Sequence, residues 1–326
     1  MPAAAVPLPT DSDARPDTPA GVPTGCTGYL AAEGYTDDLI HELGEVVSVH
    51  GRLVLAAGPP RPAAWAQNVW FDPVRLPIAS IGDAARGLRA MQRNWVAYAF
   101  HLHRRSELIA AKLPPVSAKP LLFGAPVPTA PLGSWCLENE HSLLAAPRCS
   151  SPFAHGAPTF VENRSDPPNR AYRKLWEAFT VTGCRPLAGQ LCLDLGSSPG
   201  GWTWVLHELG ARVISVDKAP LAPHIAALPR VEYVQASAFS LDPTRFAAVD
   251  WLFSDVICYP QRLWAMTEKW RDSGKVRNML CSIKFQRDTD HETAARFAAV
   301  PGATLFHLAQ NKHELTWLWH SEPPPA

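Results

Sequence analysis

Residues 191–202 read LCLDLGSSPGGW, and this stretch decides the fold. The apolar run 191–195 predicts a strand, and the glycines behind it predict a tight turn into a helix over 202–209. A second apolar strand over 212–216 is followed by Asp217. An acid in this position of a nucleotide-binding α/β fold accepts hydrogen bonds from ribose hydroxyls. The complete order of strand, glycine loop, helix, strand and acid predicts a site for a ligand that contains a nucleoside.

The glycine loop differs from the G-x-G-x-x-G fingerprint that holds a pyrophosphate at a helix N-terminus. Its pattern, D-x-G-x-x-P-G-G, suits a ligand without phosphates, such as S-adenosylmethionine (SAM), which combines a sulfonium, an amino acid and an adenosine. SAM is therefore the expected cofactor, and NAD or a turn without any ligand are the weaker alternatives. The residues expected to hold SAM are Asp194, Gly196, Ser198, Pro199, Gly200, Gly201, Trp202, Asp217, Ser237 and Asp255.

The rest of the second half alternates strands with crossovers of helix length. Such alternation predicts a parallel, doubly wound sheet with helices on both faces. The predicted strands cover 231–235, 249–253, 279–284, 304–308 and 315–320, and the predicted helices cover 168–180, 261–272 and 291–299.

Length and proline content suggest how the chain is divided. The chain has 326 residues, enough for two domains, and 33 prolines, about twice the usual share. Six prolines fall before residue 24 and six more between Pro114 and Pro131. The expected divisions are a disordered tail over 1–25, a small α+β module over 26–112, a proline-rich linker with a partial RNA-binding region over 113–160, and an α/β domain over 161–322. Within the small module the pattern predicts a helix over 81–100.

Composition excludes several classes of protein. No run approaches the roughly 20 apolar residues of a membrane helix, and the N-terminus lacks the features of a secretory signal. The seven cysteines are odd in number, scattered and without a C-x-x-C pair, which indicates reduced thiols in a cytoplasmic protein and no metal site.

The charges bear on nucleic-acid binding. The 30 basic residues balance 30 acidic ones, so any binding of RNA must come from local clusters. Each cluster alone is also explained as a solvated helix face. The clusters are Arg86, Arg89 and Arg93; Arg104 and Arg105; Arg164, Arg170, Arg173 and Lys174; and Lys269, Arg271, Lys275 and Arg277.

Four further residues are candidates for catalysis. Asp255 directly follows a predicted strand, at the edge of the sheet where ligands bind. Lys284 ends the apolar strand 279–284, so its ammonium must be paired or its pKa must fall. Lys174 and Glu314 would each be assigned to the surface if taken alone.

Together these positions carry a family resemblance. Lys174, Asp255, Lys284 and Glu314, with the run DLGSSPGGW, resemble the K-D-K-E tetrad and SAM loop of the FtsJ-type ribose 2′-O-methyltransferases. Residues 170–175, RAYRKL, are similar to the R-A-x-x-K-L motif of that family. The nearest branch comprises bacterial enzymes that modify a cytidine of the large-subunit rRNA.

The resemblance covers about 161–320 and implies both a fold and a function. The implied fold is a Rossmann-like α/β domain with a mostly parallel seven-stranded sheet whose last strand is antiparallel, preceded by a ferredoxin-like α+β module. The implied activity is SAM-dependent methyl transfer to a ribose 2′-hydroxyl of RNA, namely a cytidine of 23S rRNA or its precursor. No metal and no membrane is implied, and a monomer is expected.

The resemblance also implies a role for each member of the tetrad. Lys284 would be the general base, and Lys174 would stabilise the developing alkoxide. Asp255 would orient Lys284 and itself lie near the sulfonium, and Glu314 would hold the lysines in place. Two features depart from the family. The region between Arg104 and Leu132 is short for the RNA-binding THUMP domain of the relatives, and Ser237 stands where an Asp usually faces the adenine.

Three other readings remain open from the sequence. One is a SAM-dependent enzyme that acts on a small molecule or a protein, for which the tetrad would be dispensable. Another is an inactive RNA-binding or assembly factor with this fold, and a third is an NAD-dependent oxidoreductase. The intact loop and tetrad disfavour the second reading, and the absence of G-x-G-x-x-G disfavours the third.

Overall fold

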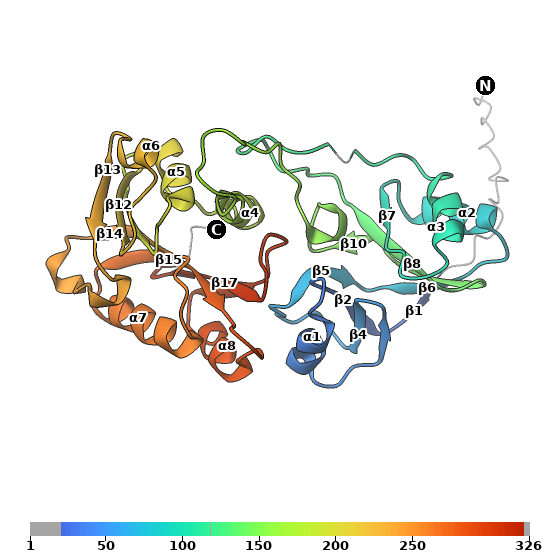
Figure 1. Ribbon diagram of the computed structural model, residues 1–326. Coiled ribbons are helices and arrows are strands. Elements are labelled where there is room, and N and C mark those ends of the chain that lie inside the picture. Colours follow the sequence, from blue (N-terminus) through green and yellow to red (C-terminus); the bar gives the residue numbers. More distant parts are fainter. Residues whose placement is uncertain (1–20, 118, 323–326) are drawn as a thin grey trace, which may run out of the picture.

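The computed structural model describes residues 21–117 and 119–322, which form two lobes (Figure 1). Most of the expected disordered tail, residues 1–20, lies outside the described residues. None of the helices in the described part is long and apolar enough to cross a bilayer.

The C-terminal lobe contains one seven-stranded sheet in the order β13-β12-β11-β14-β15-β17-β16. All neighbouring pairs are parallel except those of β17, which runs antiparallel to both β15 and β16. This confirms the fold class predicted from the sequence. The strands are β11 (Leu191–Leu195), β12 (Arg212–Asp217), β13 (Val231–Gln235), β14 (Val249–Ser254), β15 (Val276–Lys284), β16 (Ala303–Phe306) and β17 (Glu314–His320).

Helices cover both faces of this sheet because its central strands are apolar on both sides. Helices α4, α5 and α6 lie on one face and α7 and α8 on the other (Figure 1). Along β11, Cys192 packs among residues of α4, α5 and α6, and Leu193 and Leu195 pack with residues of α7 and α8. The helices are α4 (Tyr172–Thr182), α5 (Gly201–Glu208), α6 (Pro223–Ala226), α7 (Pro260–Asp272) and α8 (His291–Ala298).

The N-terminal lobe has two five-stranded sheets, in the orders β1-β6-β9-β8-β7 and β10-β5-β2-β4-β3. Its strands are β1 (Val22–Pro23), β2 (Cys26–Ala31), β3 (Ser48–His50), β4 (Leu53–Ala57), β5 (Ala66–Phe71), β6 (Val74–Pro77), β7 (Trp95–Ala97), β8 (Gly133–Asn139), β9 (Ser142–Ala146) and β10 (Arg148–Cys149). Its helices are α1 (Thr36–Leu43), α2 (Ile81–Met91) and α3 (His103–Ala110).

Two features of this lobe differ from the sequence-based expectations. The helix expected over 81–100 ends at Met91, because Trp95 and its neighbours pair as β7 with β8 instead. The range 113–160, expected to be a proline-rich linker with a partial RNA-binding region, contains β8 and β9, which lie inside a sheet. The local reason is their apolar content: Trp135, Leu143 and Leu144 are fully buried, and such side chains stabilise a sheet whatever the prolines before them.

Aromatic residues join the two lobes. Trp65, which is 1% exposed, packs against Tyr35 with ring centroids 4.8 Å apart. Across the junction Trp65 lies 5.9 Å from Phe285, and Tyr35 stacks on His313 at 5.5 Å. Phe285 directly follows Lys284, and His313 directly precedes Glu314. The N-terminal lobe therefore packs on the two segments that carry a lysine and a glutamate of the tetrad.

We predict that Trp65→Ala lowers the free energy of unfolding by about 3 to 5 kcal/mol, the usual cost of removing a large buried aromatic ring. Urea denaturation measures the change. Leu187→Ala is the control, because that side chain is 66% exposed and its loss should change stability by less than about 0.5 kcal/mol. A loss below about 1 kcal/mol for Trp65→Ala would show that this ring does not stabilise the junction.

Candidate active site

The glycines of the loop after β11 stand where there is no room for a side chain. Gly196 and Gly200 have φ angles of +77° and +114°, which favour glycine. A Cβ on Gly196 would lie 2.9 Å from Cα of Val256, and one on Gly201 would lie 2.1 Å from Oδ1 of Asn169. The loop thus runs directly against the segment that follows β14, at the carboxyl edge of the sheet.

Asp217 lies at the end of β12 and faces this loop. Its Oδ2 accepts a hydrogen bond from the backbone N–H of Ser198 at 3.0 Å, and its Oδ1 accepts one from the N–H of Ala219 at 2.9 Å. The side chain remains partly exposed, and each carboxylate oxygen keeps a further lone pair. Asp217 can therefore shape the loop and still accept bonds from a ligand.

Asp194 lies beneath the loop. It is 1% exposed, and its Oδ2 accepts a hydrogen bond from Oγ1 of Thr203 at 2.7 Å. Burial raises its pKa to about 7, partly offset by the hydrogen bonds from Thr203. This carboxyl group supports the start of α5 from inside the protein.

Several other residues expected at the cofactor site already have partners in the protein. The ring of Trp202 is buried, and its Nε1 donates to the carbonyl of Ala171 at 3.0 Å. The hydroxyl of Ser198 donates to the carbonyl of Pro220 at 2.8 Å. Ser237 accepts a bond of 3.4 Å from the N–H of Phe239 and caps a short 3₁₀ turn. These side chains hold the walls of the site in place.

Two serines that sequence reasoning missed have buried hydroxyls without a hydrogen-bond partner among the described residues. They are Ser197, inside the glycine loop, and Ser254, the last residue of β14. Strand pairing places Ser254 beside Leu195, the last residue before the loop. Buried hydroxyls without partners are unusual, and a polar ligand at this edge of the sheet would satisfy them. Their positions, in the glycine loop and at the end of β14, were the only signal in the sequence.

The structure brings the four tetrad residues together from four elements. Nζ of Lys174, on α4, lies 3.0 Å from Oδ1 of Asp255 and 2.6 Å from Oε1 of Glu314. Nζ of Lys284 lies 3.1 Å from the same Oδ1 and donates to the backbone carbonyl of Asp255 at 2.5 Å. The antiparallel register of β15 and β17 places Lys284 directly opposite Glu314.

The cluster is nearly enclosed, since its side chains are between 7% and 19% exposed. Burial alone would lower the pKa of Lys174, but the carboxylates of Asp255 and Glu314 outweigh burial and raise it. Burial alone would raise the pKa of Asp255, but the two lysines outweigh burial and lower it. Of the two outcomes that the sequence allowed for Lys284, the structure shows pairing.

A further acidic residue that sequence reasoning missed supports Glu314. Glu177 is 2% exposed, and its carboxylate accepts hydrogen bonds from the N–H groups of Ala309 and Gln310 at 2.6 and 3.0 Å. In the same loop, Nδ2 of Asn311 donates to the carbonyl of Glu314 at 3.2 Å. Glu177 lies three residues after Lys174 on α4, a spacing that puts both on one side of the helix. That spacing was the available signal.

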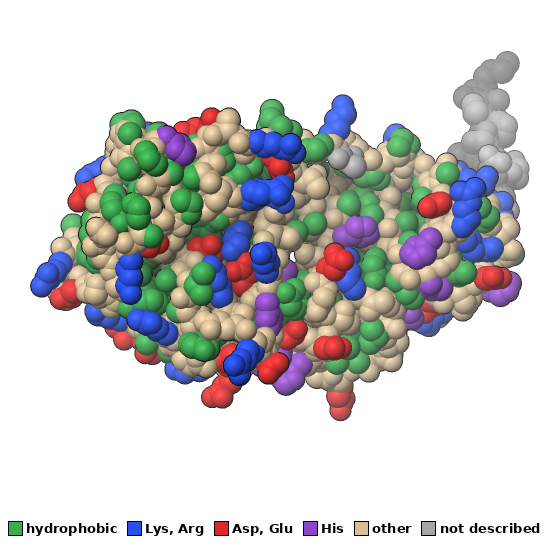
Figure 2. All heavy atoms as spheres, viewed as in Figure 1, with side chains coloured by type: hydrophobic (Ala, Val, Ile, Leu, Met, Phe, Trp, Pro, Cys, Tyr) green, Lys and Arg blue, Asp and Glu red, His purple; other side chains and the backbone are tan. Residues whose placement is uncertain are grey.

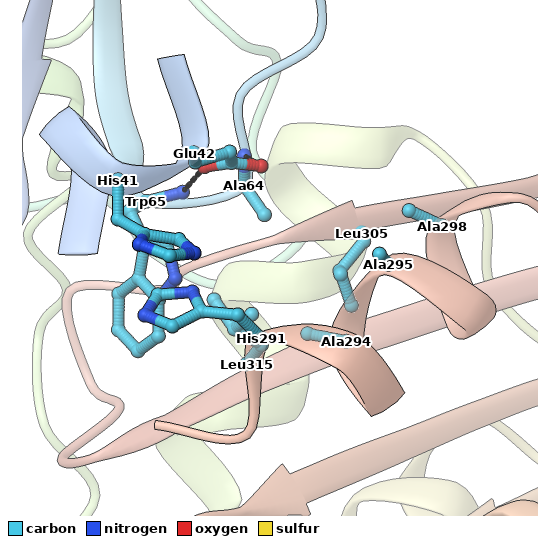
Figure 3. A pocket seen from close by; sticks show the side chains of 10 residues that line it. All are labelled: His41, Glu42, Ala64, Trp65, His291, Ala294, Ala295, Ala298, Leu305 and Leu315. Carbon is cyan, nitrogen blue, oxygen red and sulfur yellow. Dashed lines mark hydrogen bonds between the residues drawn. The ribbon is translucent and has the colours of Figure 1, made fainter. Parts of the chain in front are cut away.

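A separate cavity of about 230 Å³ lies between the lobes (Figure 3). The imidazoles of His41 and His291 stack in it at 3.9 Å, and Glu42 accepts hydrogen bonds from the N–H groups of Ala64 and Trp65. Its lining includes Leu315 but no member of the tetrad. No group of three or more His, Cys, Asp or Glu side chains in residues 21–117 and 119–322 is arranged to hold a metal ion.

Each of the basic clusters has an acidic partner nearby. On the face shown in Figure 2, Lys and Arg side chains are interspersed with acidic ones. Glu162 alone pairs with Arg164, Arg170 and Arg173, at 3.3, 2.8 and 2.7 Å. Part of the positive charge near α4 is therefore compensated within the protein.

The C-terminal part of the chain is similar to known methyltransferases. Residues 167–303 match the model of the FtsJ-like methyltransferase family. Ribosomal RNA large subunit methyltransferase M of Halorhodospira halophila is 35% identical over 152 residues, which cover 45% of this chain and 44% of that protein. The protein of the same name in Xanthomonas axonopodis pv. citri is 30% identical over 219 residues, or 61% of each chain.

The chain thus spans about half the length of the curated relatives it matches. Among solved structures, TrmN from Thermus thermophilus is similar with a TM-score of 0.37 and 14% identity, over 90% of this chain and 99% of that one. The resemblance to the FtsJ-type enzymes is confirmed over residues 167–303.

Asp194→Asn should change how stability depends on pH. Because the folded-state pKa of about 7 lies above the ordinary 3.8, the folded protein binds more protons than the unfolded chain between these values. Its free energy of unfolding therefore falls as the pH rises through this window, by about 1.4 kcal/mol for each pKa unit. Asparagine keeps an acceptor for Thr203 and cannot ionise. The free energy of unfolding of the variant should therefore decrease less as the pH rises.

Urea denaturation of both proteins between about pH 4 and pH 8 measures the difference. Other buried acids contribute equally to both curves and cancel. If the free energy of unfolding depended on pH in the same way in both proteins, the raised pKa of Asp194 would be contradicted.

Proposed function

We propose that the FtsJ-like methyltransferase domain at residues 167–303 transfers a methyl group from SAM to a ribose 2′-hydroxyl of RNA. The observation that carries this proposal is the pair of ammonium groups, from Lys174 and Lys284, on one oxygen of Asp255 beside the glycine loop. A hydroxyl of low acidity needs a base to take its proton and a positive charge to stabilise the alkoxide that forms. The tetrad contains a candidate for each task.

The residues at the carboxyl edge fit SAM. The backbone of Gly196 to Gly201 would lie against the cofactor, Asp217 would accept from its ribose hydroxyls, and Ser197 and Ser254 offer unpaired hydroxyls. Asp255 would place its negative charge near the sulfonium. When bound, SAM supplies an electrophilic methyl group on that sulfonium, and no metal is needed for the transfer.

The contacts of the two lysines support different roles for them. Lys174 has two carboxylate partners, and its raised pKa keeps its charge, as a stabiliser of an alkoxide requires. Lys284 contacts one carboxylate and one neutral backbone carbonyl, so it has fewer charged partners than Lys174. We therefore assign Lys284 as the base, Lys174 as the electrostatic stabiliser, Asp255 as the group that orients Lys284, and Glu314 as the anchor of Lys174.

The relatives support ribosomal RNA as the substrate. They are named for methylation of large-subunit ribosomal RNA, and we propose a cytidine of 23S rRNA or its precursor for this chain. One chain contains the whole tetrad, so the proposal needs no second subunit. The seven cysteines are all free thiols, which fits a reducing cytoplasm.

Lys284→Ala should reduce methyl transfer by about 10² to 10⁴, the usual cost of losing a general base, with SAM affinity unchanged. Lys284→Arg should be almost as inactive, because a guanidinium remains protonated. Single-turnover methylation of rRNA from cells that lack this gene, with labelled SAM, measures both variants. Substantial activity in the arginine variant would exclude Lys284 as the base.

Asp217→Ala should weaken SAM binding by about 1 to 3 kcal/mol, because the ribose hydroxyls would lose a charged hydrogen-bond acceptor. Isothermal titration calorimetry measures the affinity. Asp217→Asn serves as the control for the loop, since its amide oxygen can still accept one backbone N–H. Unchanged affinity in the alanine variant would remove Asp217 from the cofactor site.

A further inference from the structure

Two exposed apolar side chains lie two and four residues after the tetrad carboxylate Asp255. Ile257 is 78% exposed and Tyr259 is 63% exposed. Among the large apolar side chains exposed in the described part of the chain, Ile257 is the most exposed and Tyr259 is the only aromatic one. Apolar side chains at such a position call for a partner more than scattered ones do.

The geometry of this segment turns both side chains outward. Val256 packs against Gly196 of the cofactor loop, and Cys258 is 7% exposed in the core beneath. Tyr259 has extended backbone angles, φ −67° and ψ 147°. In extended chain, alternate residues share a face, so buried Cys258 separates two outward residues. Val256 and Cys258 thus anchor the segment to the core, and Ile257 and Tyr259 form its apolar, exposed side.

A cation lies one turn further along, at the start of α7. The N–H of Arg262 donates to the carbonyl of Tyr259 at 3.0 Å, and its guanidinium lies 3.8 Å from the ring centre of Phe239. The side chain is exposed. A guanidinium over a ring can still donate through its N–H groups, and these bind phosphate oxygens well.

An apolar pair beside a cation has the chemistry of a nucleotide contact. Unpaired bases stack on aromatic side chains while Arg or Lys contacts the backbone phosphate. A protein partner fits less well, because a stable interface needs about 800 Å² on each side, far more than two side chains provide.

We propose that Ile257 and Tyr259 form a stacking platform for an unpaired base of the substrate RNA, with Arg262 holding an adjacent phosphate. The base belongs to the target nucleotide or to its direct neighbour, because the platform begins two residues after Asp255. This inference rests on the proposed function and adds the contact that selects single-stranded RNA.

The test compares Tyr259→Ala, Tyr259→Phe and Arg262→Ala with the matched control Leu187→Ala. Leu187 is 66% exposed but precedes β11, at the opposite edge of the sheet. Fluorescence anisotropy with a labelled single-stranded oligocytidylate measures RNA affinity over a range of salt concentrations. Calorimetry measures SAM affinity, and light scattering measures molecular mass.

Tyr259→Ala should weaken RNA binding by about tenfold or more, the effect of losing one base–aromatic stack, without changing the salt dependence. Tyr259→Phe and Leu187→Ala should bind RNA with nearly the affinity of the unsubstituted protein. Arg262→Ala should reduce the slope of log affinity against log salt by about 1. SAM affinity should be the same in all variants.

Unchanged RNA affinity in Tyr259→Ala, or an equal loss in Tyr259→Phe, overturns the platform. A change of molecular mass in Tyr259→Ala would show instead that a second copy covers it. If that variant does not fold, Ile257→Ser takes its place, with the same expected loss of affinity. Failure of the proposed function has a different signature: the unchanged protein would bind SAM and methylate no RNA.

Discussion

One oxygen of Asp255 lies within 3.1 Å of two ammonium groups, and the rest of the site depends on this contact. Burying four charges is costly unless each has a partner at close range. Here two lysines and two carboxylates balance, but only when α4, β14, β15 and β17 are all docked. The packing of helices on the apolar faces of the sheet holds these elements in place. The hydrophobic core therefore offsets the free-energy cost of burying the charged cluster.

The N-terminal lobe takes part in this arrangement. Phe285, next to Lys284, and His313, next to Glu314, both pack on aromatic residues of that lobe. The N–H of Phe285 also donates to the carbonyl of His313 at 3.0 Å. All four tetrad residues belong to the C-terminal lobe. The contacts of the N-terminal lobe nevertheless support the ends of two strands that carry catalytic candidates.

How much of this could be predicted from the sequence depends on whether a signal was local. The glycine loop, Asp217 and the strand ends at Asp255 and Lys284 were predictable, because carboxyl ends of parallel strands meet at one edge. Lys174 and Glu314 were predictable only through resemblance to a family, because nothing in their local pattern separates them from surface residues. The inward position of Asp194 was not predictable, because burial is decided by what packs above it. The strands β8 and β9 were missed for a similar reason, since nearby prolines masked an apolar pattern whose partners lie far away in the chain.

Two residues of helix α4, only three positions apart, bind other parts of the site. Lys174 forms an ion pair with Glu314, and Glu177 accepts a hydrogen bond from the loop before Glu314. A movement that draws α4 outward must release both, because a helix is rigid over one turn. The contacts of Lys174 and Glu177 are therefore expected to break together. The amide hydrogens of Ala309 and Gln310 are bonded to Glu177 and would exchange with solvent when these contacts break. Their exchange rates would therefore report how often α4 moves away from the site.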